Sequence, residues 1–497
     1  MNNLKLVLGG PGCGKTTRLL QIVEEELNAG VPASAIAFVT FTKAAATEAK
    51  ERAAIKFGLD PKTDLPWFRT IHSLAYAKLG VSRDEVMDRR DWVEFGHVVG
   101  ETMSGTYDAT EGPPSGGGRE IGDSMLRVVD YAATTLLSLA EAWHSLDEFV
   151  DWHRLERFAS ALRAYKDDSD KLDYADMLLR YGREGEPVDV RVAVIDEAQD
   201  LTAAQWAAVR RAFAGAERVY VGGDDDQAIY HWAGADVPQF LSLSSAPEVL
   251  PISWRLPRSV HALSLSVARR ISHRYHKAFQ PSAREGEVIW HHRPESVDFH
   301  EGSWFLLARN TYMLTKLEAI VREAGVNYSR RAGPAVNPGH VRTMQLWEKL
   351  RTGKLADISA AEARALLKAL DQPTQQMREL QRYTLDMLHV PLGLRDSPWS
   401  VALTGIPSEA REYYLACLRR GEKLTVPPRI RIETIHGVKG AEADHVLLMT
   451  DLSHRTAKSF RQNADNEHRV FYVGMTRALQ TLQIVLPQSD LFYQIET

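Results

Sequence analysis

A glycine-rich segment close to the N-terminus has the residues needed to bind phosphate. It reads Gly9-Gly10-Pro11-Gly12-Cys13-Gly14-Lys15-Thr16-Thr17, with the spacing of a P-loop. Glycines allow backbone N–H groups to close on phosphate oxygens, and the Lys15 ammonium can reach the β- and γ-phosphates. The Thr16 hydroxyl can ligate Mg²⁺, and the helix expected next adds a partial positive charge at its N-terminus. We therefore expect this segment to bind a nucleoside triphosphate with Mg²⁺.

Two adjacent carboxylates could complete such a site. Asp196 and Glu197 directly follow the apolar run 192–195. A carboxylate at the C-terminal end of a parallel strand lies beside the crevice that holds the phosphate loop. We expect Asp196 to hold the Mg²⁺ and Glu197 to orient and polarise the attacking water. Taken alone, the same pattern also fits an acidic strand end on a solvated face.

A neutral amide and an aromatic ring follow another apolar run. Gln227 lies shortly after residues 218–221, and Trp232 comes a few residues later. An amide can sense a γ-phosphate through hydrogen bonds, and an indole face can stack on a nucleobase. A loop that carries both is what a nucleotide-driven motor on a nucleic-acid strand needs. Trp232 alone would also fit an ordinary half-buried aromatic residue.

The composition is that of a folded protein with several domains. The chain has 497 residues, with 60 Lys and Arg against 65 Asp and Glu, a formal net charge of −5. At roughly 100–200 residues per domain, this length predicts about three or four domains. Cys13 and Cys417 are too few for a disulfide framework or a cysteine zinc site, so no structural metal is expected. With neither a signal peptide nor a long apolar run, we expect a cytoplasmic protein without a membrane partner.

Basic residues are concentrated in one segment of an otherwise acidic chain. Because the net charge is negative, any binding to nucleic acid cannot depend on a surface that is basic all over. The most basic stretch, residues 269–277, contains Arg269, Arg270, Arg274 and Lys277. We interpret it either as a solvated helix face or as a local phosphate-binding patch.

Short apolar runs bounded by turn residues or charges predict parallel α/β sheets. The expected strands are 4–8, 35–41, 190–195, 218–221, 249–252, 304–308, 430–434, 445–449 and 482–486. Two long stretches depart from this alternation and have helical periodicity. They are residues 81–180, with a flexible break at 111–118, and residues 339–424. Both are expected to be helical insertions in α/β cores.

Nine segments, in order along the chain, resemble the motifs of superfamily 1A DNA helicases of the UvrD/Rep type. They are 9–17 (motif I), 40–52 (Ia), 68–73 (Ib), 196–200 (II), 223–236 (III), 252–259 (IV), 306–310 (IVa), 434–442 (V) and 467–478 (VI). The resemblance therefore spans residues 9–478, and order, spacing and residue types agree.

The resemblance implies an α/β fold of two RecA-like P-loop domains with parallel sheets and with ATP bound between them. The first core is expected over 1–80 and 181–247, with a helical insertion over 81–180. The second core is expected over 248–338 and 425–497, with a short helical insertion over 339–424.

The resemblance also implies roles for individual residues. The implied catalytic residues are Lys15, Glu197, Gln227, Arg255 and Arg477, the two arginines as fingers on the transferred phosphate. With ATP and Mg²⁺ as cofactors, Thr16 and Asp196 are the implied metal ligands. The implied nucleotide-binding residues are Gly10, Pro11, Gly12, Cys13, Gly14, Lys15, Thr16, Thr17, Trp254, Arg255, Glu442 and Arg477. Trp254 stands where the family has a tyrosine that stacks on adenine.

DNA contacts are implied in the same way. The implied residues are Phe41, Thr70, His72, Tyr230, Trp232, Thr434 and His436, with Arg309 and Asn310 as weaker candidates. Phe41, Tyr230 and Trp232 would stack on bases. Outside its motif, His72 would more often be a satisfied core histidine.

Three features depart from the family pattern. Residues 1–8 contain no glutamine, although the family has a glutamine motif before its P-loop, so adenine specificity is open. Ala233 follows Trp232 where the family often has arginine, so one phosphate or coupling contact is missing or supplied elsewhere. The insertion over 339–424 is short for the family, which favours reduced duplex-opening elements.

The expected function is that of an ATP-dependent DNA helicase that moves 3′ to 5′ on single-stranded DNA and unwinds duplex at junctions. An alternative is a single-stranded DNA translocase that displaces proteins with little unwinding. A P-loop phosphotransferase that is not a motor is a distant alternative. We expect a monomeric or weakly self-associating protein that joins the nucleoid when it binds DNA.

Overall fold

The structure is a computed structural model that describes residues 3–105, 120–146, 148, 150–243, 246–299, 301–373 and 377–496. The break expected at 111–118 lies outside the described residues. The chain divides into two compact units. Unit 1 comprises Met1–Glu285 and Lys458–Thr476, and unit 2 comprises Gly286–Ala457 and Arg477–Thr497. Unit 1 includes two segments that were expected in the second core, residues 248–285 and 458–476. The limits of the two cores expected from the order of the motifs remain a prediction.

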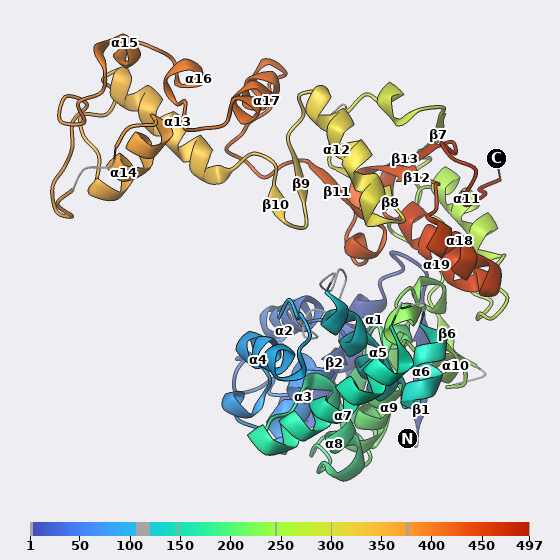
Figure 1. The fold of residues 1–497 in the computed structure, drawn as a ribbon. Helices are drawn as coiled ribbons and strands as arrows, with labels where there is room; N and C mark the ends of the chain where they lie inside the picture. Colours follow the sequence, from blue (N-terminus) through green and yellow to red (C-terminus); the bar gives the residue numbers. More distant parts are fainter. Residues whose placement is uncertain are drawn as a thin grey trace. The chain divides into compact units, whose positions relative to one another are not determined.

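Unit 1 contains a parallel six-stranded sheet (Figure 1). Its strands are β1 (Leu4–Leu8), β2 (Ile36–Thr40), β3 (Phe68–Thr70), β4 (Val192–Ile195), β5 (Arg218–Gly223) and β6 (Glu248–Val249). They follow the order β3-β2-β4-β5-β1-β6. β1, β2 and β4 carry apolar side chains on both faces because helices cover the sheet on both sides, as in other parallel sheets. The C-terminal ends of β1, β4 and β5 therefore meet at one edge.

Helices of unit 1 flank this sheet, namely α1 (Lys15–Asn28), α2 (Lys43–Phe57), α3 (Ile71–Leu79), α9 (Ala203–Ala212) and α10 (Val237–Leu241). Unit 1 also contains α11 (Arg258–Ala268) and α19 (Ala464–Met475). α1 buries Leu19, Ile22 and Val23, the stripe expected from its 3.6-residue period. α11 packs on α19, which brings two segments far apart in the sequence side by side.

The first insertion is helical, as expected. Its helices are α4 (Arg89–Val99), α5 (Ile121–Thr135), α6 (Leu139–Ser145), α7 (Trp152–Ser169) and α8 (Tyr174–Glu184). Phe95, Leu126, Leu155 and Phe158 belong to a buried apolar cluster of their own. α8 packs on α3 and α9, which joins the insertion to the sheet layer.

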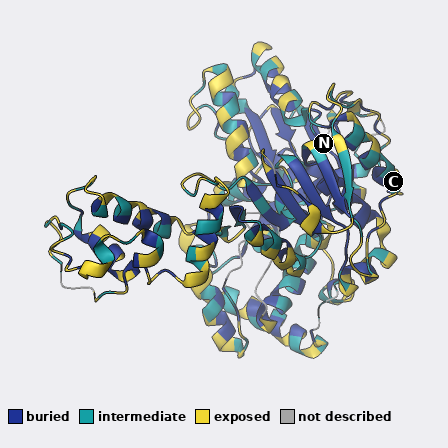
Figure 2. Ribbon diagram, turned by 90° about the horizontal axis from the view of Figure 1, so that it is seen from above, coloured by how far each residue is buried: buried dark blue, intermediate teal, exposed yellow. Residues whose placement is uncertain are grey.

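Unit 2 contains a seven-stranded sheet in the order β10-β9-β11-β8-β12-β13-β7. Its strands are β7 (Glu287–His291), β8 (Trp304–Ala308), β9 (Tyr328–Arg330), β10 (Gly333–Pro334), β11 (Ile430–Thr434), β12 (Ala443–Met449) and β13 (Ala478–Val485). β9 and β10 pair antiparallel, and the other described pairs are parallel. α12 (Leu314–Glu323) packs on this sheet, and α18 (His454–Gln462) follows β12. Figure 2 shows central strands in the colour of buried residues, with exposed positions on the helices.

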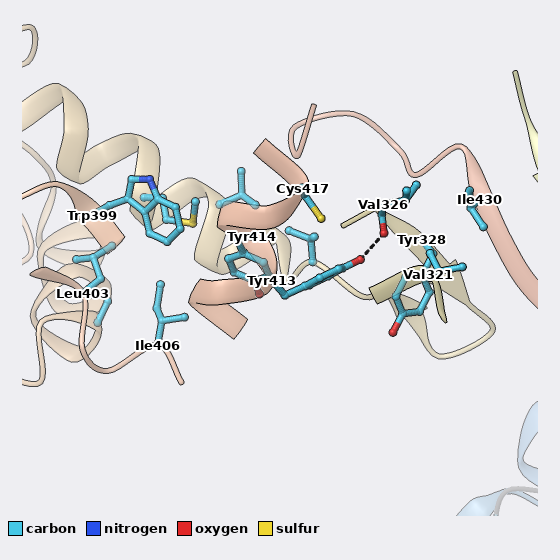
Figure 3. Packing of buried hydrophobic residues seen from close by; sticks show 14 of the residues in the cluster. Val321, Val326, Tyr328, Trp399, Leu403, Ile406, Tyr413, Tyr414, Cys417 and Ile430 are labelled. Atoms are coloured by element: carbon cyan, nitrogen blue, oxygen red, sulfur yellow. Dashed lines mark hydrogen bonds between the residues drawn. The ribbon is translucent and has the colours of Figure 1, made fainter. Parts of the chain in front are cut away.

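The second insertion is also helical and joins the core of unit 2. Its helices are α13 (Pro338–Arg351), α14 (Ala360–Ala369), α15 (Leu392–Arg395), α16 (Trp399–Ala402) and α17 (Ser408–Arg419). Figure 3 shows Tyr413 of α17 between the helices and the sheet. Its hydroxyl donates a 2.7 Å hydrogen bond to the Val326 carbonyl, so α17 ties the insertion to the strands.

The α/β fold of two parallel RecA-like sheets with helical insertions is confirmed. Strands 4–8, 304–308 and 430–434 have the predicted limits. The strand predicted at 249–252 is wrong in extent, because β6 ends at Val249 and Pro251 follows. Four short or amphipathic strands, β3, β7, β9 and β10, were not predicted. Among the described residues, no helix is both long and apolar enough to cross a bilayer.

Candidate functional site

The P-loop connects β1 to α1 and leaves the first N–H groups of the helix without a side-chain cap. Gly14 is the N-cap residue, and as a glycine in the left-handed region (φ +79°) it has no side chain to occupy them. Lys15 Nζ donates a 3.1 Å hydrogen bond to the Gly9 carbonyl across the loop. Thr17 Oγ1 accepts a 3.1 Å hydrogen bond from Arg52. Such a loop fits phosphate oxygens, which accept hydrogen bonds from free N–H groups.

Four residues from two neighbouring segments contact this loop, namely Ser253, Trp254, Arg255 and Phe279. Ser253 Oγ donates to the Pro11 carbonyl at 2.6 Å, and the Trp254 N–H donates to the Gly12 carbonyl at 2.9 Å. A Cβ atom at Gly12 would lie 2.2 Å from Arg255 Cβ, and one at Gly10 would lie 2.5 Å from the Phe279 ring. The glycines are therefore required by this close approach.

Cys13 and Trp254 differ in exposure although both adjoin the loop. Burial raises the pKa of the Cys13 thiol to about 11, so the side chain is a neutral packing group. The Trp254 side chain is 72% exposed, which leaves an aromatic face open to a base.

The acidic strand end lies against the P-loop. Thr16 Oγ1 donates a 2.7 Å hydrogen bond to Asp196 Oδ2, and the Glu197 N–H donates to Asp196 Oδ1 at 2.9 Å. Burial, reinforced by the Glu197 charge, raises the pKa of Asp196 to about 6. The Thr16 hydroxyl and the Asp196 carboxylate fit Mg²⁺, which prefers oxygen ligands and takes few from the protein. The described residues contain no cluster of three or more His, Cys, Asp or Glu side chains suited to a metal ion.

Glu197 and Gln227 are linked through a chain of hydrogen bonds. Glu197 is in the left-handed region (φ +53°), an uncommon conformation for a glutamate. Gln199 Nε2 donates to Glu197 Oε2 at 2.6 Å, while Gln199 Oε1 accepts from the Asp224 N–H at 3.0 Å. The Asp224 carboxylate in turn accepts a 2.5 Å hydrogen bond from Gln227 Nε2. Gln199 and Asp224 were not predicted as site residues, although both stand within the motifs II and III identified from the sequence.

Unit 1 brings most of the expected nucleotide-site residues together, and unit 2 carries the others. Lys15, Thr16, Asp196, Glu197, Gln227, Trp254 and Arg255 belong to unit 1. Arg477 and Glu442 belong to unit 2. The Arg477 side chain is buried there, and its guanidinium donates a 3.4 Å hydrogen bond to the Ala441 carbonyl. Glu442 is exposed.

Three expected DNA-stacking residues form a row in unit 1. The Phe41 and Tyr230 rings are stacked with centroids 5.7 Å apart. Tyr230 and Trp232 meet edge to face at 6.5 Å. Trp232, in the 3₁₀ turn His231–Ala233, is 36% exposed. This row offers flat faces on which bases of any type can stack.

Thr70 and His72 line a cavity of about 720 Å³ at the junction of the sheet layer and the first insertion. Thr70 caps α3, accepting a 3.2 Å hydrogen bond from the Ser73 N–H. Burial lowers the pKa of His72 to about 4, and its ring meets Tyr174 edge to face. His72 is therefore neutral near pH 7. Other charged and aromatic side chains share this cavity and were not predicted as site residues, namely Lys43, Tyr76, Arg83, Asp84, Asp88, Arg89, Lys171 and Tyr174.

The other expected DNA contacts are in unit 2. Thr434 ends β11, and His436 follows in the 3₁₀ turn His436–Val438. Arg309 is partly buried after β8. The Asn310 side chain bonds with Thr456 and with the Ser453 N–H, so it has a structural role.

Both interpretations of the basic stretch 269–277 are wrong for Arg274 and Lys277. The Arg274 side chain is 6% exposed and contacts both oxygens of Asp226 at 2.8 and 2.5 Å. Lys277 is buried among Asp224, Asp225 and Asp226. These cations pair with carboxylates inside the protein, so they are neither a solvated face nor a phosphate patch.

Two family models match the chain. Residues 1–248 match the UvrD/REP helicase N-terminal domain, and residues 154–489 match the UvrD-like helicase C-terminal domain. Together they cover both units.

Individual relatives are about one quarter identical to this chain in sequence. The ATP-dependent DNA helicase PcrA of Bacillus subtilis is 24% identical over 370 residues, which are 65% of this chain and 48% of that protein. PcrA of Leuconostoc citreum is 25% identical over 335 residues, 61% of this chain and 42% of that protein. The chain thus spans about half the length of the relatives it matches. The helicase nonstructural protein 10 of an arterivirus superposes with a TM-score of 0.36 and 13% identity, covering 98% of this chain and 60% of that one, too low a score to establish a shared fold.

Proposed function

Because the chain belongs to the UvrD-like helicase family, we propose that it is an ATP-dependent DNA helicase that moves 3′ to 5′ on single-stranded DNA. Family membership confirms the resemblance identified from the nine motifs. The observation that carries the activity is the site in unit 1, where the P-loop, the acidic strand end and Gln227 are joined by hydrogen bonds.

In this proposal the chain's own groups prepare ATP for hydrolysis. Lys15 and the P-loop N–H groups bind the phosphates, and Trp254 stacks on the base. Thr16 and Asp196 hold Mg²⁺, which supplies charge neutralisation at the phosphates. Glu197, held by Gln199, orients the attacking water and accepts its proton.

Arginines and a neutral amide act on the γ-phosphate. Gln227 senses it by a hydrogen bond, and Arg255 and Arg477 stabilise its developing charge. Such arginines contribute roughly 10³–10⁵ in rate in related phosphoryl transfers. Glu442 contacts the ribose or organises the phosphate side.

Single-stranded DNA is proposed to bind along aromatic and polar contacts. Phe41, Tyr230 and Trp232 supply stacking worth roughly 1–3 kcal/mol per base. Thr70, His72, Thr434, His436 and Arg309 are proposed to contact the strand backbone. Four cations and two aspartates line the cavity at His72, and Lys171 is paired with Asp91, so the basic excess there is modest and local, which suits a chain of net charge −5. We further propose that the protein works in the cytoplasm on junctions of single-stranded and duplex DNA, as a monomer or weak oligomer.

A translocase that removes proteins from single strands with little unwinding is the second candidate. The second insertion favours it, because residues 339–424 are short for the family that the motifs resemble. Both candidate functions use the same ATPase residues. Only a measurement of duplex unwinding against protein displacement from single strands separates them.

Strand displacement on tailed duplexes tests the proposal. Wild-type protein with ATP and Mg²⁺ should displace a labelled strand from a 3′-tailed duplex and leave a 5′-tailed duplex intact. Lys15→Ala is the matched control and should displace neither. Displacement only from 5′ tails would overturn the direction. If neither duplex opens but streptavidin is removed from a biotinylated single strand, the translocase replaces the helicase.

A further inference from the structure

Three consecutive aspartates lie fully buried in unit 1. Asp224, Asp225 and Asp226 follow β5 and are each 0% exposed. Charged carboxylates in such a place are stable only when opposite charges and hydrogen bonds compensate them. The groups that compensate them therefore determine the conformation of the loop that bears Gln227.

Lys277 is the central compensating group. Its side chain is 0% exposed, and its Nζ contacts Asp224 Oδ1 at 3.2 Å, Asp226 Oδ2 at 3.0 Å and also Asp225. Burial favours a neutral amine, but the three carboxylates outweigh it and raise the pKa of Lys277. The ammonium is therefore charged at neutral pH, and it contacts all three aspartates at once.

Two arginines also bind this segment, one at the Asp226 carboxylate and one at the Asp225 backbone. Arg274 forms the two-pronged contact with Asp226, and Arg469 donates a 2.9 Å hydrogen bond to the Asp225 carbonyl. The hydrogen bonds of these arginines go to Asp226, to the Asp225 carbonyl and to the His273 carbonyl. Among the cations of this cluster, Lys277 is the one that contacts Asp224.

Asp224 connects this cluster to the proposed hydrolytic groups. One of its oxygens accepts from Gln227 Nε2, and the other faces Lys277. Its backbone N–H bonds to Gln199, which holds Glu197. Burial raises the pKa of Asp224, but the charges of Lys277 and Lys15, together with the hydrogen bonds from Gln227 and Lys277, more than offset it. The pKa is therefore lowered, which keeps the carboxylate ionised.

We infer that Lys277 is a positioning residue for ATP hydrolysis, whose ammonium fixes the Asp224 carboxylate so that Asp224 orients the Gln227 amide. The inference rests on the proposed function of Gln227 as the γ-phosphate sensor. Lys277 is buried and is not expected to contact the nucleotide. Its substitution should therefore change the rate of ATP hydrolysis and leave the affinity for ATP unchanged.

Basal ATP hydrolysis without DNA provides the first readout. In Lys277→Gln, kcat should fall on the order of 10²-fold, the usual effect of a misplaced catalytic group. The Kd for a fluorescent ATP analogue should change little, since Lys277 does not touch the P-loop. An equal loss of ATP affinity would overturn the inference.

A double-mutant cycle with Gln227→Ala provides the decisive readout. If Lys277 acts through Gln227, then Lys277→Gln should have little further effect on kcat in the Gln227→Ala background. A loss by the same factor in both backgrounds would mean a merely structural role and would overturn the inference.

Arg274→Gln is the matched control, because it removes another buried ion pair of the same cluster without touching Asp224. It should lower the midpoint of thermal unfolding but keep kcat near that of wild type. A kcat as low as that of Lys277→Gln would contradict a specific route through Asp224. Should Lys277→Gln fail to fold, Asp224→Asn enters the same cycle with the same expectation. If the wild-type protein hydrolyses ATP at a rate that does not change with DNA, the proposed motor function is wrong. The double-mutant cycle still tests whether Lys277 acts through Gln227.

Discussion

Thr16 of the P-loop donates a 2.7 Å hydrogen bond from its hydroxyl to the carboxylate of Asp196 at the end of β4. The two residues are 180 positions apart in the sequence, so only the parallel order of β1, β5 and β4 places them together. Both side chains offer oxygen atoms, and the contact marks where we propose that Mg²⁺ binds.

Thr16→Val should weaken the use of Mg²⁺. The substitution keeps the shape but removes a ligand, and a loss of about 1.4 kcal/mol corresponds to tenfold weaker binding. The Mg²⁺ concentration for half-maximal ATP hydrolysis should therefore rise. Thr134→Val, which removes a hydroxyl that bonds to the Asp130 carbonyl in the first insertion, is the control. An unchanged Mg²⁺ dependence in Thr16→Val would refute the ligand role.

Gly12→Ala should impair nucleotide binding more than it impairs folding. Gly12 and Gly30 both have positive φ, +70° and +86°, so alanine at either costs about 1–2 kcal/mol of backbone strain. Only at Gly12 would the new Cβ collide with Arg255, whereas Gly30 has open space. Calorimetric unfolding and ATP titration of the two variants separate these effects. Equal ATP affinity in both would contradict the close approach of Arg255.

The motifs predicted the chemistry of the nucleotide site well, because Lys15, Thr16 and Asp196 stand at fixed distances from apolar runs that become strands. They predicted less of what holds the site in place. Asp225 and Lys277 are 52 residues apart, and nothing local marks them as partners. A basic stretch looks the same in sequence whether its charges meet water or buried carboxylates, which is why Arg274 and Lys277 were misinterpreted. β3, with three residues, is too short to show a period.

Stability should respond to His72 at mildly acidic pH. Its pKa is lowered to about 4 from an ordinary 6.5, so protons bind the unfolded chain more readily. The stabilisation from neutral His72 is complete above pH 6.5 and is lost as the pH falls towards 4. The loss amounts to at most about 3 kcal/mol. Thermal unfolding from pH 7 to pH 4 should show a smaller decrease in His72→Gln than in wild type.

His97→Gln, at an exposed position of α4, is the control for that comparison. A neutral His72 also predicts that DNA affinity between pH 6 and 8 does not depend on its titration. If His72→Gln and wild type lose stability in parallel over the whole range, the buried neutral histidine is refuted.

Trp232→Ala should separate hydrolysis from movement along DNA. Losing one stacking face removes roughly 1–3 kcal/mol per base, so affinity for oligothymidine should fall. At saturating DNA the variant should still hydrolyse ATP but displace little strand per ATP consumed. Trp232→Phe should recover much of the displacement. Wild-type displacement by Trp232→Ala would remove the stacking role.

Steady-state ATP hydrolysis with and without single-stranded DNA tests the central claim most directly. A motor of the proposed kind should show a higher kcat when single-stranded DNA is added, with duplex DNA of equal length as the comparison. Glu197→Gln should lower the stimulated rate by about 10²-fold or more, as expected for loss of a general base. A rate that is the same with and without DNA, or that survives Glu197→Gln, would contradict the account.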